Sequence, residues 1–224
     1  MIPIRDQIPV HRTPVVNYIL IAANILVFGL MWLAGPAQES LVNQFAMIPA
    51  NFADGISAGD ILDIFTSMFM HAGFAHIAGN MLYLWIFGDN VEDRMGPIMY
   101  LAFYLAGGVI ASLAHIFTNP ASQIPTVGAS GAIAAVLGAY LVLFPQSKIV
   151  TFIPLGFFMR LTVVPAIIVL GLWFILQLFS GVMSLGGPDV GGVAFWAHIG
   201  GFVAGMLMAK LLAPRAKVDQ SVSW

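Results

Sequence analysis

The sequence predicts an all-α integral membrane protein, a bundle of six transmembrane helices with both termini in the cytoplasm. Three observations indicate this fold class. Hydrophobic residues make up 60% of the 224 residues and charged residues only 8%, whereas a typical soluble domain has about 25% charged residues. The apolar residues fall into six runs, and a chain of this size can hold about six spans of roughly 20 residues each. The third observation is the position of the basic residues along the chain.

The six predicted spans form one domain, 15–212, between a short cytoplasmic segment, 1–14, and a cytoplasmic tail, 213–224. The connector after the first span, 34–64, is long and partly apolar. We therefore expect it to have structure of its own and to lie partly in the membrane interface. Five of the spans are expected at 15–33, 98–117, 130–144, 161–179 and 194–212. The second span is expected to start between residues 66 and 75 and to end near residue 88.

The basic residues give the orientation of the predicted bundle. With six spans, all eight fall on the side that holds both termini, and the opposite connectors 34–64, 118–127 and 181–192 contain none. Basic residues stay on the cytoplasmic side, which places both termini there. Because no cleavage site follows the first apolar run, we expect this span to be retained, in a bacterial inner membrane. The eight residues are Arg5, Arg12, Arg94, Lys148, Arg160, Lys210, Arg215 and Lys217.

Composition also limits the chemistry that the chain can support. It contains no cysteine, which excludes disulfides, thiol catalysis and thiolate metal sites. No basic patch suggests nucleic acid as a partner, and nothing indicates a cofactor. A metal site made by His71, His76 and His198 is a weaker alternative, since imidazole suits zinc but no carboxylate shares their predicted depth. We therefore expect neither a cofactor nor a metal.

The fourth predicted span is short and opens with the sequence Gly-Ala-Ser-Gly at 128–131. Its length of about 15 residues gives a helix of roughly 22 Å, less than a hydrocarbon core of about 30 Å. We therefore expect Ser130 to lie below the membrane surface, in a protein-lined or watery recess. Gly128 and Gly131 would let a bound substrate approach the backbone closely. The alternative is that Ser130 is a helix N-cap and that the glycines serve helix packing.

Three predicted helices bring polar side chains to a similar depth on one side. Ser130 opens the fourth span, His198 lies about four residues into the sixth, and His76 and Asn80 lie in the outer half of the second. Polar residues inside a membrane are costly and by default indicate function. These residue types suit acyl transfer, with Ser130 as nucleophile and His198 as its base. The Ser130 backbone N–H, His76 and Asn80 are candidate donors to the oxyanion.

The same residues allow simpler interpretations. A lone histidine in a helix is often a packing residue, and Asn80 could be an interhelical hydrogen-bonding group. Gly201 is interpreted as a close helix-packing position. No aspartate or glutamate lies within spans four or six to orient His198, so the sequence favours a catalytic dyad over a triad.

These segments together resemble the rhomboid family of intramembrane serine proteases. The segments GASG at 128–131, AHIGG at 197–201 and HAGFAHIAGN at 71–80 carry the resemblance, and EDRMG at 92–96 is similar to the Glu-x-Arg-x-Gly element of the family. The resemblance covers about 15–212. It implies a six-helix core with Ser130 as nucleophile and His198 as base in a water-filled cavity, and oxyanion assistance from His76 and Asn80.

The resemblance also implies structural roles. Glu92 and Arg94 would stabilise the cytoplasmic side, and His71 would support the first connector and the cavity. The connector 34–64 would be a membrane-embedded loop, and 181–192 would be a mobile cap over the site. Some members place a tyrosine four residues after the serine, beneath the catalytic histidine, where this chain has Ala134. The sequence therefore does not indicate what supports the His198 ring.

The expected function is intramembrane serine endopeptidase activity. The substrates would be single-span membrane proteins, cleaved at or near the outer membrane boundary through Ser130 and His198, with membrane lipid as the other partner. A catalytically inactive rhomboid-like factor that binds membrane proteins is one alternative, but such proteins usually lack the serine or the histidine. A small polytopic transporter is another, but the polar residues cluster on one side instead of crossing both leaflets. The oligomeric state is not indicated.

Overall fold

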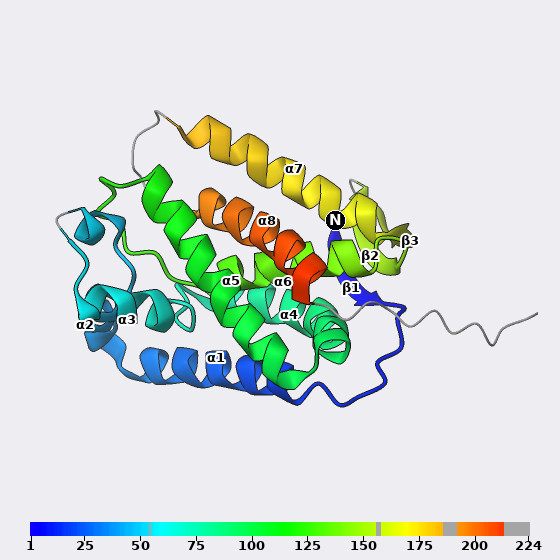
Figure 1. Cartoon of the computed structure of the whole chain (residues 1–224), viewed down its shortest axis with the longest axis horizontal. Coiled ribbons are helices and arrows are strands. Elements are labelled where there is room, and N and C mark those ends of the chain that lie inside the picture. Colours follow the sequence, from blue (N-terminus) through cyan, green and yellow to red (C-terminus); the bar gives the residue numbers. More distant parts are fainter. Residues whose placement is uncertain (54, 156–157, 186–191, 213–224) are drawn as a thin grey trace, which may run out of the picture.

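The computed structural model describes residues 1–53, 55–155, 158–185 and 192–212, and its ribbon consists mainly of α-helices (Figure 1). Two short 3-10 helices and three strands complete the elements. In chain order they are β1 (Ile2–Asp6), α1 (Val15–Leu33), η1 (Gly35–Ala37), α2 (Gln38–Phe45), η2 (Pro49–Phe52), α3 (Ala58–Ser67), α4 (Phe74–Met95), α5 (Pro97–Thr118), α6 (Ser130–Leu143), β2 (Lys148–Leu155), β3 (Phe158–Pro165), α7 (Ala166–Ser184) and α8 (Phe195–Leu212).

Helix α6 is the centre of the bundle. Every residue from Gly131 to Tyr140 is buried, and the helix contacts α4, α5, α7 and α8. A helix that is apolar on all sides and has no solvent-facing stripe is typical of a core position. The neighbouring helices therefore shield α6 from the surroundings, which explains how a span too short to cross a bilayer can still be a stable helix.

Helices α6 and α8 approach each other through glycines. A Cβ at Gly201 would collide with the carbonyl oxygen of Gly131, and one at Gly205 would collide with that of Ala135. Across the same interface, a Cβ at Gly138 would collide with the carbonyl oxygen of Phe202. Small residues allow this backbone contact between membrane helices, and the contact brings the start of α8 beside the start of α6.

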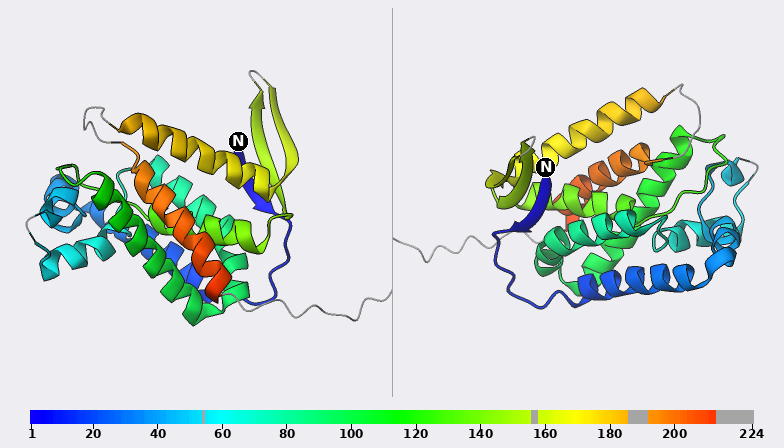
Figure 2. Two further views of the ribbon diagram at one scale, coloured as in Figure 1. Left: turned by 45° about the horizontal axis from the view of Figure 1, so that its top comes forward. Right: turned by 180° about the vertical axis from the view of Figure 1, so that it is seen from behind.

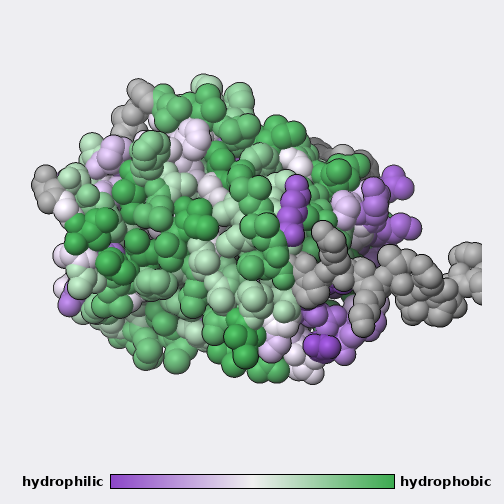
Figure 3. Space-filling model, viewed as in Figure 1, coloured by the Kyte–Doolittle hydropathy of each residue, from purple (hydrophilic) through white to green (hydrophobic). Residues whose placement is uncertain are grey.

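The surface suits a lipid environment. Figure 3 shows apolar side chains over most of the visible face, and hydrophilic ones gather at the end that carries β1 and the β2–β3 hairpin. Within the described part of the chain, α1, α5, α7 and α8 are long and apolar enough to cross a membrane, and α6 is a shorter apolar helix. The structure thus describes a membrane protein with several apolar helices. Helix α4 is long but carries polar and charged residues along its length.

The prediction of an all-α fold is corrected by a three-stranded antiparallel sheet of order β1-β2-β3. Ile2 pairs with Phe152, and Lys148 pairs with Pro165. Figure 2 shows the β2–β3 hairpin extending away from the helices beside the start of α7. The segment was expected to be a connector followed by a helix from 161, but its β-branched residues favour strands. Helix α7 therefore begins five residues later than predicted, after Pro165 instead of around it.

The end of the second span also differs from the expectation. The second span was predicted to end near 88, but α4 continues to Met95, so the charged residues at its end lie on the helix. The connector 34–64 has structure of its own, as expected: α2 and α3 lie at the end of the bundle opposite the sheet (Figure 1). The predicted tail, 213–224, and half of the predicted cap, 186–191, lie outside the described residues, and the first four residues of that cap, 181–184, belong to α7.

Candidate active site

Ser130 is the first residue of α6, and its side chain does not cap the helix. The N-cap position is Ala129, which makes no side-chain cap hydrogen bond. Ser130 Oγ instead lies 2.8 Å from Nε2 of His198. As the first residue of a helix, Ser130 has a backbone N–H with no intrahelical acceptor. The structure therefore does not support the N-cap interpretation, and the hydroxyl is directed at an imidazole.

The loop before α6 is fixed to the first connector. The Gly128 N–H donates to the carbonyl oxygen of Ser67 at 2.9 Å, and the Thr126 N–H donates to that of Met47 at 2.8 Å. Gly128 has a φ of +131°, a value that favours glycine. A side chain there would also lie 2.7 Å from Nε2 of His76. The structured connector thus determines where Ser130 starts its helix, and Gly128 leaves room for the His76 ring.

His198 is buried one turn into α8 and is held at both ring nitrogens. Its Nε2 faces Ser130 Oγ, and its Nδ1 lies 2.8 Å from Oε1 of Gln177 on α7. Because an amide oxygen only accepts, Nδ1 carries the proton of the neutral ring. Nε2 is then the acceptor of the Ser130 hydroxyl proton. This is the tautomer that a general base for Ser130 requires.

The ring of Trp173 lies beside the His198 ring, with centroids 5.9 Å apart and an angle of 34° between the planes. The Trp173 ring also lies beside the Phe202 ring, with centroids 5.8 Å apart. Ala134, the position at which a tyrosine beneath the histidine was considered, is completely buried in α6. The support of the His198 ring in this chain therefore comes from α7.

His76 and Asn80 lie one turn apart on α4, and both line the cavity that contains Ser130. The Asn80 side chain is 8% exposed, and its Nδ2 has no hydrogen-bond partner among the described residues. A buried donor without a partner is uncommon in native proteins. Because Asn80 lines the cavity, a group bound there is a candidate partner for this donor. His71 is buried behind them, with its ring centroid 5.1 Å from that of His76.

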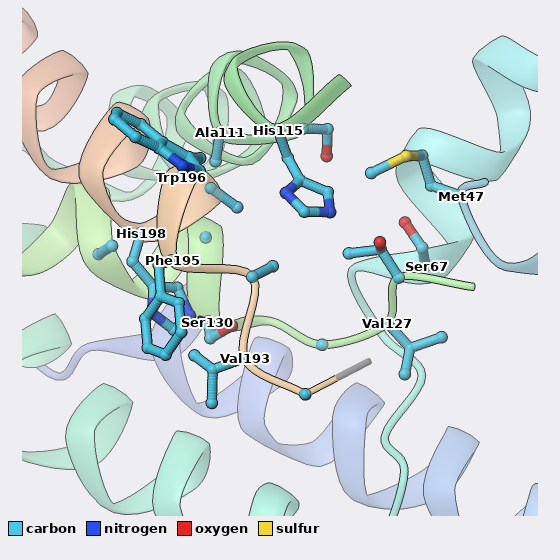
Figure 4. A pocket seen from close by; sticks show the side chains of 18 of the residues that line it. Met47, Ser67, Ala111, His115, Val127, Ser130, Val193, Phe195, Trp196 and His198 are labelled. Atoms are coloured by element: carbon cyan, nitrogen blue, oxygen red, sulfur yellow. Dashed lines mark hydrogen bonds between the residues drawn. The ribbon is translucent and has the colours of Figure 1, made fainter. Parts of the chain in front are cut away.

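The cavity has a volume of about 1340 Å³ and is lined by residues of the helices from α3 to α8 and by the loop before α6. Figure 4 shows Ser130 and His198 at one side of it, close to Phe195, with Met47 and Ser67 at the other side. Sites for small molecules usually measure about 300–1,000 Å³. The space here is large enough for an extended peptide segment.

The other predicted site residues take different places. Gly131 lines the cavity, but a Cβ there would meet Cβ of Ala111 at 2.7 Å, so it is also a packing residue. Glu92 is buried at the opposite end of α4 and accepts the backbone N–H groups of Val16 and Asn17 at 3.0 and 2.7 Å. Arg94 lines a smaller cavity near that end. The described residues contain no group of three His, Cys, Asp or Glu side chains able to hold a metal.

Sequence reasoning missed Gln177 and Trp173. Spans four and six contain no carboxylate to orient His198, and the partner in the structure is a neutral amide on α7. One signal was present in the sequence: Trp173, Gln177 and Gly181 recur every four residues in an otherwise apolar run. This spacing places them on one face of a helix.

A family model described as the rhomboid domain matches residues 58–215, which include α4, α6, α7 and α8. The chain belongs to the rhomboid family. This rhomboid is similar to the rhomboid protease GluP of Bacillus subtilis (strain 168). The two sequences are 30% identical over 204 residues, which is 91% of this rhomboid.

Two mitochondrial relatives are also similar. The human presenilin-associated rhomboid-like protein is 31% identical over 178 residues, or 77% of this chain. Rhomboid protein 1 of Saccharomyces cerevisiae is 29% identical over 140 residues, or 61% of the chain. The matched regions are 36%, 45% and 38% of the lengths of the bacterial, human and yeast proteins. This rhomboid thus spans less than half of each of these relatives.

Proposed function

We propose that this rhomboid is an intramembrane serine endopeptidase that uses Ser130 as nucleophile and His198 as general base. The observation that carries the proposal is the 2.8 Å contact between Ser130 Oγ and His198 Nε2 at the wall of a peptide-sized cavity. Membership of a family that includes a named protease supports it. An inactive binding factor would not need this pair, and a transporter would need polar groups through both leaflets.

The reaction follows from the positions of these groups. Ser130 Oγ attacks the carbonyl carbon of the scissile bond while its proton moves to Nε2 of His198. The carbonyl oxygen becomes an oxyanion, for which the Ser130 N–H, Asn80 Nδ2 and His76 are the candidate donors. When the C–N bond breaks, His198 Nε2 gives its proton to the leaving amine. Water then attacks the acyl-enzyme with His198 again as base, which regenerates Ser130.

The substrates that we propose are single-span membrane proteins, cleaved at or near the outer boundary of a bacterial cell membrane. The support is the charge pattern: the basic residues lie on the side of the termini in a six-span topology, and such residues stay cytoplasmic. Ser130 then opens to the outer side. A substrate helix must unwind before its peptide bond can reach Ser130, so residues that weaken helices near the bond would favour cleavage.

The test is cleavage of a model single-span substrate by the purified protein in liposomes. Wild type is expected to cleave it and Ser130→Ala is expected not to. Ser147→Ala is the matched control, because Ser147 follows the other end of α6 and does not line the cavity. Equal cleavage by wild type and Ser130→Ala would refute the mechanism. Tight binding of the substrate without cleavage by the wild type would favour the inactive binding factor.

A further inference from the structure

Gln177 is a polar side chain on an apolar helix. Helix α7 has a mean hydropathy of 2.2 over its best 18-residue window, and several neighbours of Gln177 are highly exposed, as expected for residues that face lipid. Ile175 is 61% exposed and Phe179 is 65% exposed. Gln177 is less exposed and lies on the same face of α7 as Trp173, which contacts His198. A polar group inside a membrane helix is costly unless it has a partner, and the partner here is His198.

We propose that Gln177 is the positioning residue of the base, which holds His198 in the tautomer and orientation that Ser130 needs. This inference rests on the proposed function. With Gln177 Oε1 at 2.8 Å from Nδ1, the Nδ1–H donates to the amide and the lone pair of Nε2 is directed at Ser130. If the amide were reversed, its NH₂ would donate to Nδ1 and the ring proton would move to Nε2. The ring would then donate to Ser130 Oγ and could not accept its proton.

The partner is neutral, and this distinguishes the site from a triad with a carboxylate. During acylation the proton goes from Ser130 Oγ to His198 Nε2, and the ring becomes an imidazolium with an N–H at each nitrogen. The Nδ1–H stays bonded to the amide oxygen, and no proton moves to Gln177. Gln177 therefore contributes the fixed direction of its amide dipole, and it holds the orientation of the His198 ring. Trp173, one turn earlier on α7, confines the same ring from a second direction.

The decisive comparison is between two substitutions at this position. Gln177→Met keeps the length of the side chain and removes the acceptor, whereas Gln177→Glu keeps an acceptor oxygen at the same reach. We expect Gln177→Met to lower kcat by about 10- to 100-fold, as the loss of a partner that orients a functional histidine does. KM should stay within about twofold, and Gln177→Glu should retain at least about a third of the wild-type kcat. Leu176→Met introduces the same side chain at an exposed neighbouring position of α7. It is the control for effects of a methionine on the helix itself, and it should leave kcat unchanged.

A second readout does not depend on proteolysis. In the protein labelled with ¹⁵N in its histidine rings, the His198 signals, identified by their loss in His198→Ala, should show a protonated Nδ1 and an unprotonated Nε2. Gln177→Met should give a mixture of both tautomers. Wild-type kcat in Gln177→Met, equal losses in the Met and Glu variants, or a single unchanged tautomer in Gln177→Met would overturn the inference. If wild type and Ser130→Ala cleave equally while the tautomer still depends on Gln177, the proposed function fails and the positioning role stands.

Discussion

The two ends of α6 are built in different ways. At its start, Ser130 faces a cavity of about 1340 Å³, and Asn80 Nδ2 lines that space without a partner. At its other end, Tyr140 donates to Asp6 at 2.6 Å, and Asp6 also accepts from Asn90 at 2.8 Å. Buried polar groups that bond to one another, as Tyr140 and Asp6 do, stabilise a fold, and a buried donor beside an open cavity is available to a ligand. The difference indicates function at the first end and stability at the second.

We call the end of the bundle that holds Ser130 the open end, and the end that holds Tyr140, Asp6 and Asn90 the closed end. The closed end joins segments that are far apart in the sequence. Glu92 near the end of α4 accepts two backbone N–H groups at the start of α1, where no side-chain cap is present. Asn17 in turn donates to the carbonyl oxygen of Leu84 and accepts from the Tyr100 hydroxyl. A Cβ at Gly88 would collide with the Asn17 side chain, so the network also requires close helix packing. This end fixes α1, α4 and α5 relative to one another.

The largest expected effect at the open end is that of His198→Ala. Without a base, kcat should fall by about 10⁴- to 10⁶-fold, and combining it with Ser130→Ala should add little, because the two residues act as one unit. The measurement is cleavage of a single-span substrate in liposomes. His11→Ala, at the closed end, should retain activity. A loss of less than tenfold in His198→Ala would contradict the assigned role.

A smaller effect is expected for the candidate oxyanion donors. Asn80→Ala or His76→Ala should lower kcat by about 10- to 1000-fold, as the loss of one oxyanion donor does. Because Asn80 Nδ2 has no partner, Asn80→Ala should not lower the unfolding temperature. Asn80→Asp, which keeps the shape but replaces the donor by an acceptor, should be as inactive as Asn80→Ala. Full activity in Asn80→Asp would show that Asn80 is not a donor.

The closed end should give the reverse result. Glu92→Ala should lower the free energy of unfolding by about 2–4 kcal/mol, since a buried and a partly buried N–H group at the start of α1 lose their acceptor. The kcat per folded molecule should stay within about threefold, measured in detergent below the unfolding transition. Asp93→Ala, whose carboxylate accepts an exposed N–H of His11, should change stability by less than about 1 kcal/mol. A large loss of kcat in folded Glu92→Ala would mean that the two ends are coupled.

The smallest expected effect is the pH dependence of the closed end. Burial raises the pKa of Asp6 above its ordinary value of 3.8, so the folded protein keeps a proton that the unfolded chain has already released. Stability therefore falls as the pH rises from about 3.8 through the folded pKa, and the loss persists at neutral pH. Asp6→Asn should remove this slope and be at least as stable near pH 7, in thermal unfolding measured across the acid range. The same slope in Asp6→Asn would assign the effect to another group.

The helices and the residues of the predicted dyad could be expected from the sequence because long apolar runs and polar residues at matching depth are strong local signals. Ser130 and His198 lie in such positions, and the structure brings them together. The sheet was missed because β2 and the start of β3 fall in a segment expected to be a connector, and the end of β3 falls in the apolar run expected to be a membrane helix from 161. Only its β-branched residues and Pro165 indicated strands. The pairing of β1 with β2 joins residues that are far apart in the sequence, so no local pattern indicates it.

Gln177 illustrates a second limit. Its spacing from Trp173 indicates a shared face, but a period of four residues does not say which helix that face contacts. The packing of α7 on α8 decides this, and it depends on glycines such as Gly181, where a Cβ would lie 3.0 Å from Ile199. The support of the His198 ring therefore becomes visible only in three dimensions.

The role of Ser130 as a nucleophile activated by His198 is tested most directly by covalent labelling with a fluorophosphonate. Mass spectrometry on the intact chain would locate the labelled residue. Ser130 should be labelled in the wild type and in Glu92→Ala, because the closed end does not take part in the chemistry. Labelling should be lost in His198→Ala. A label on another serine, or equal labelling of Ser130 in His198→Ala, would show that Ser130 is not a nucleophile activated by His198.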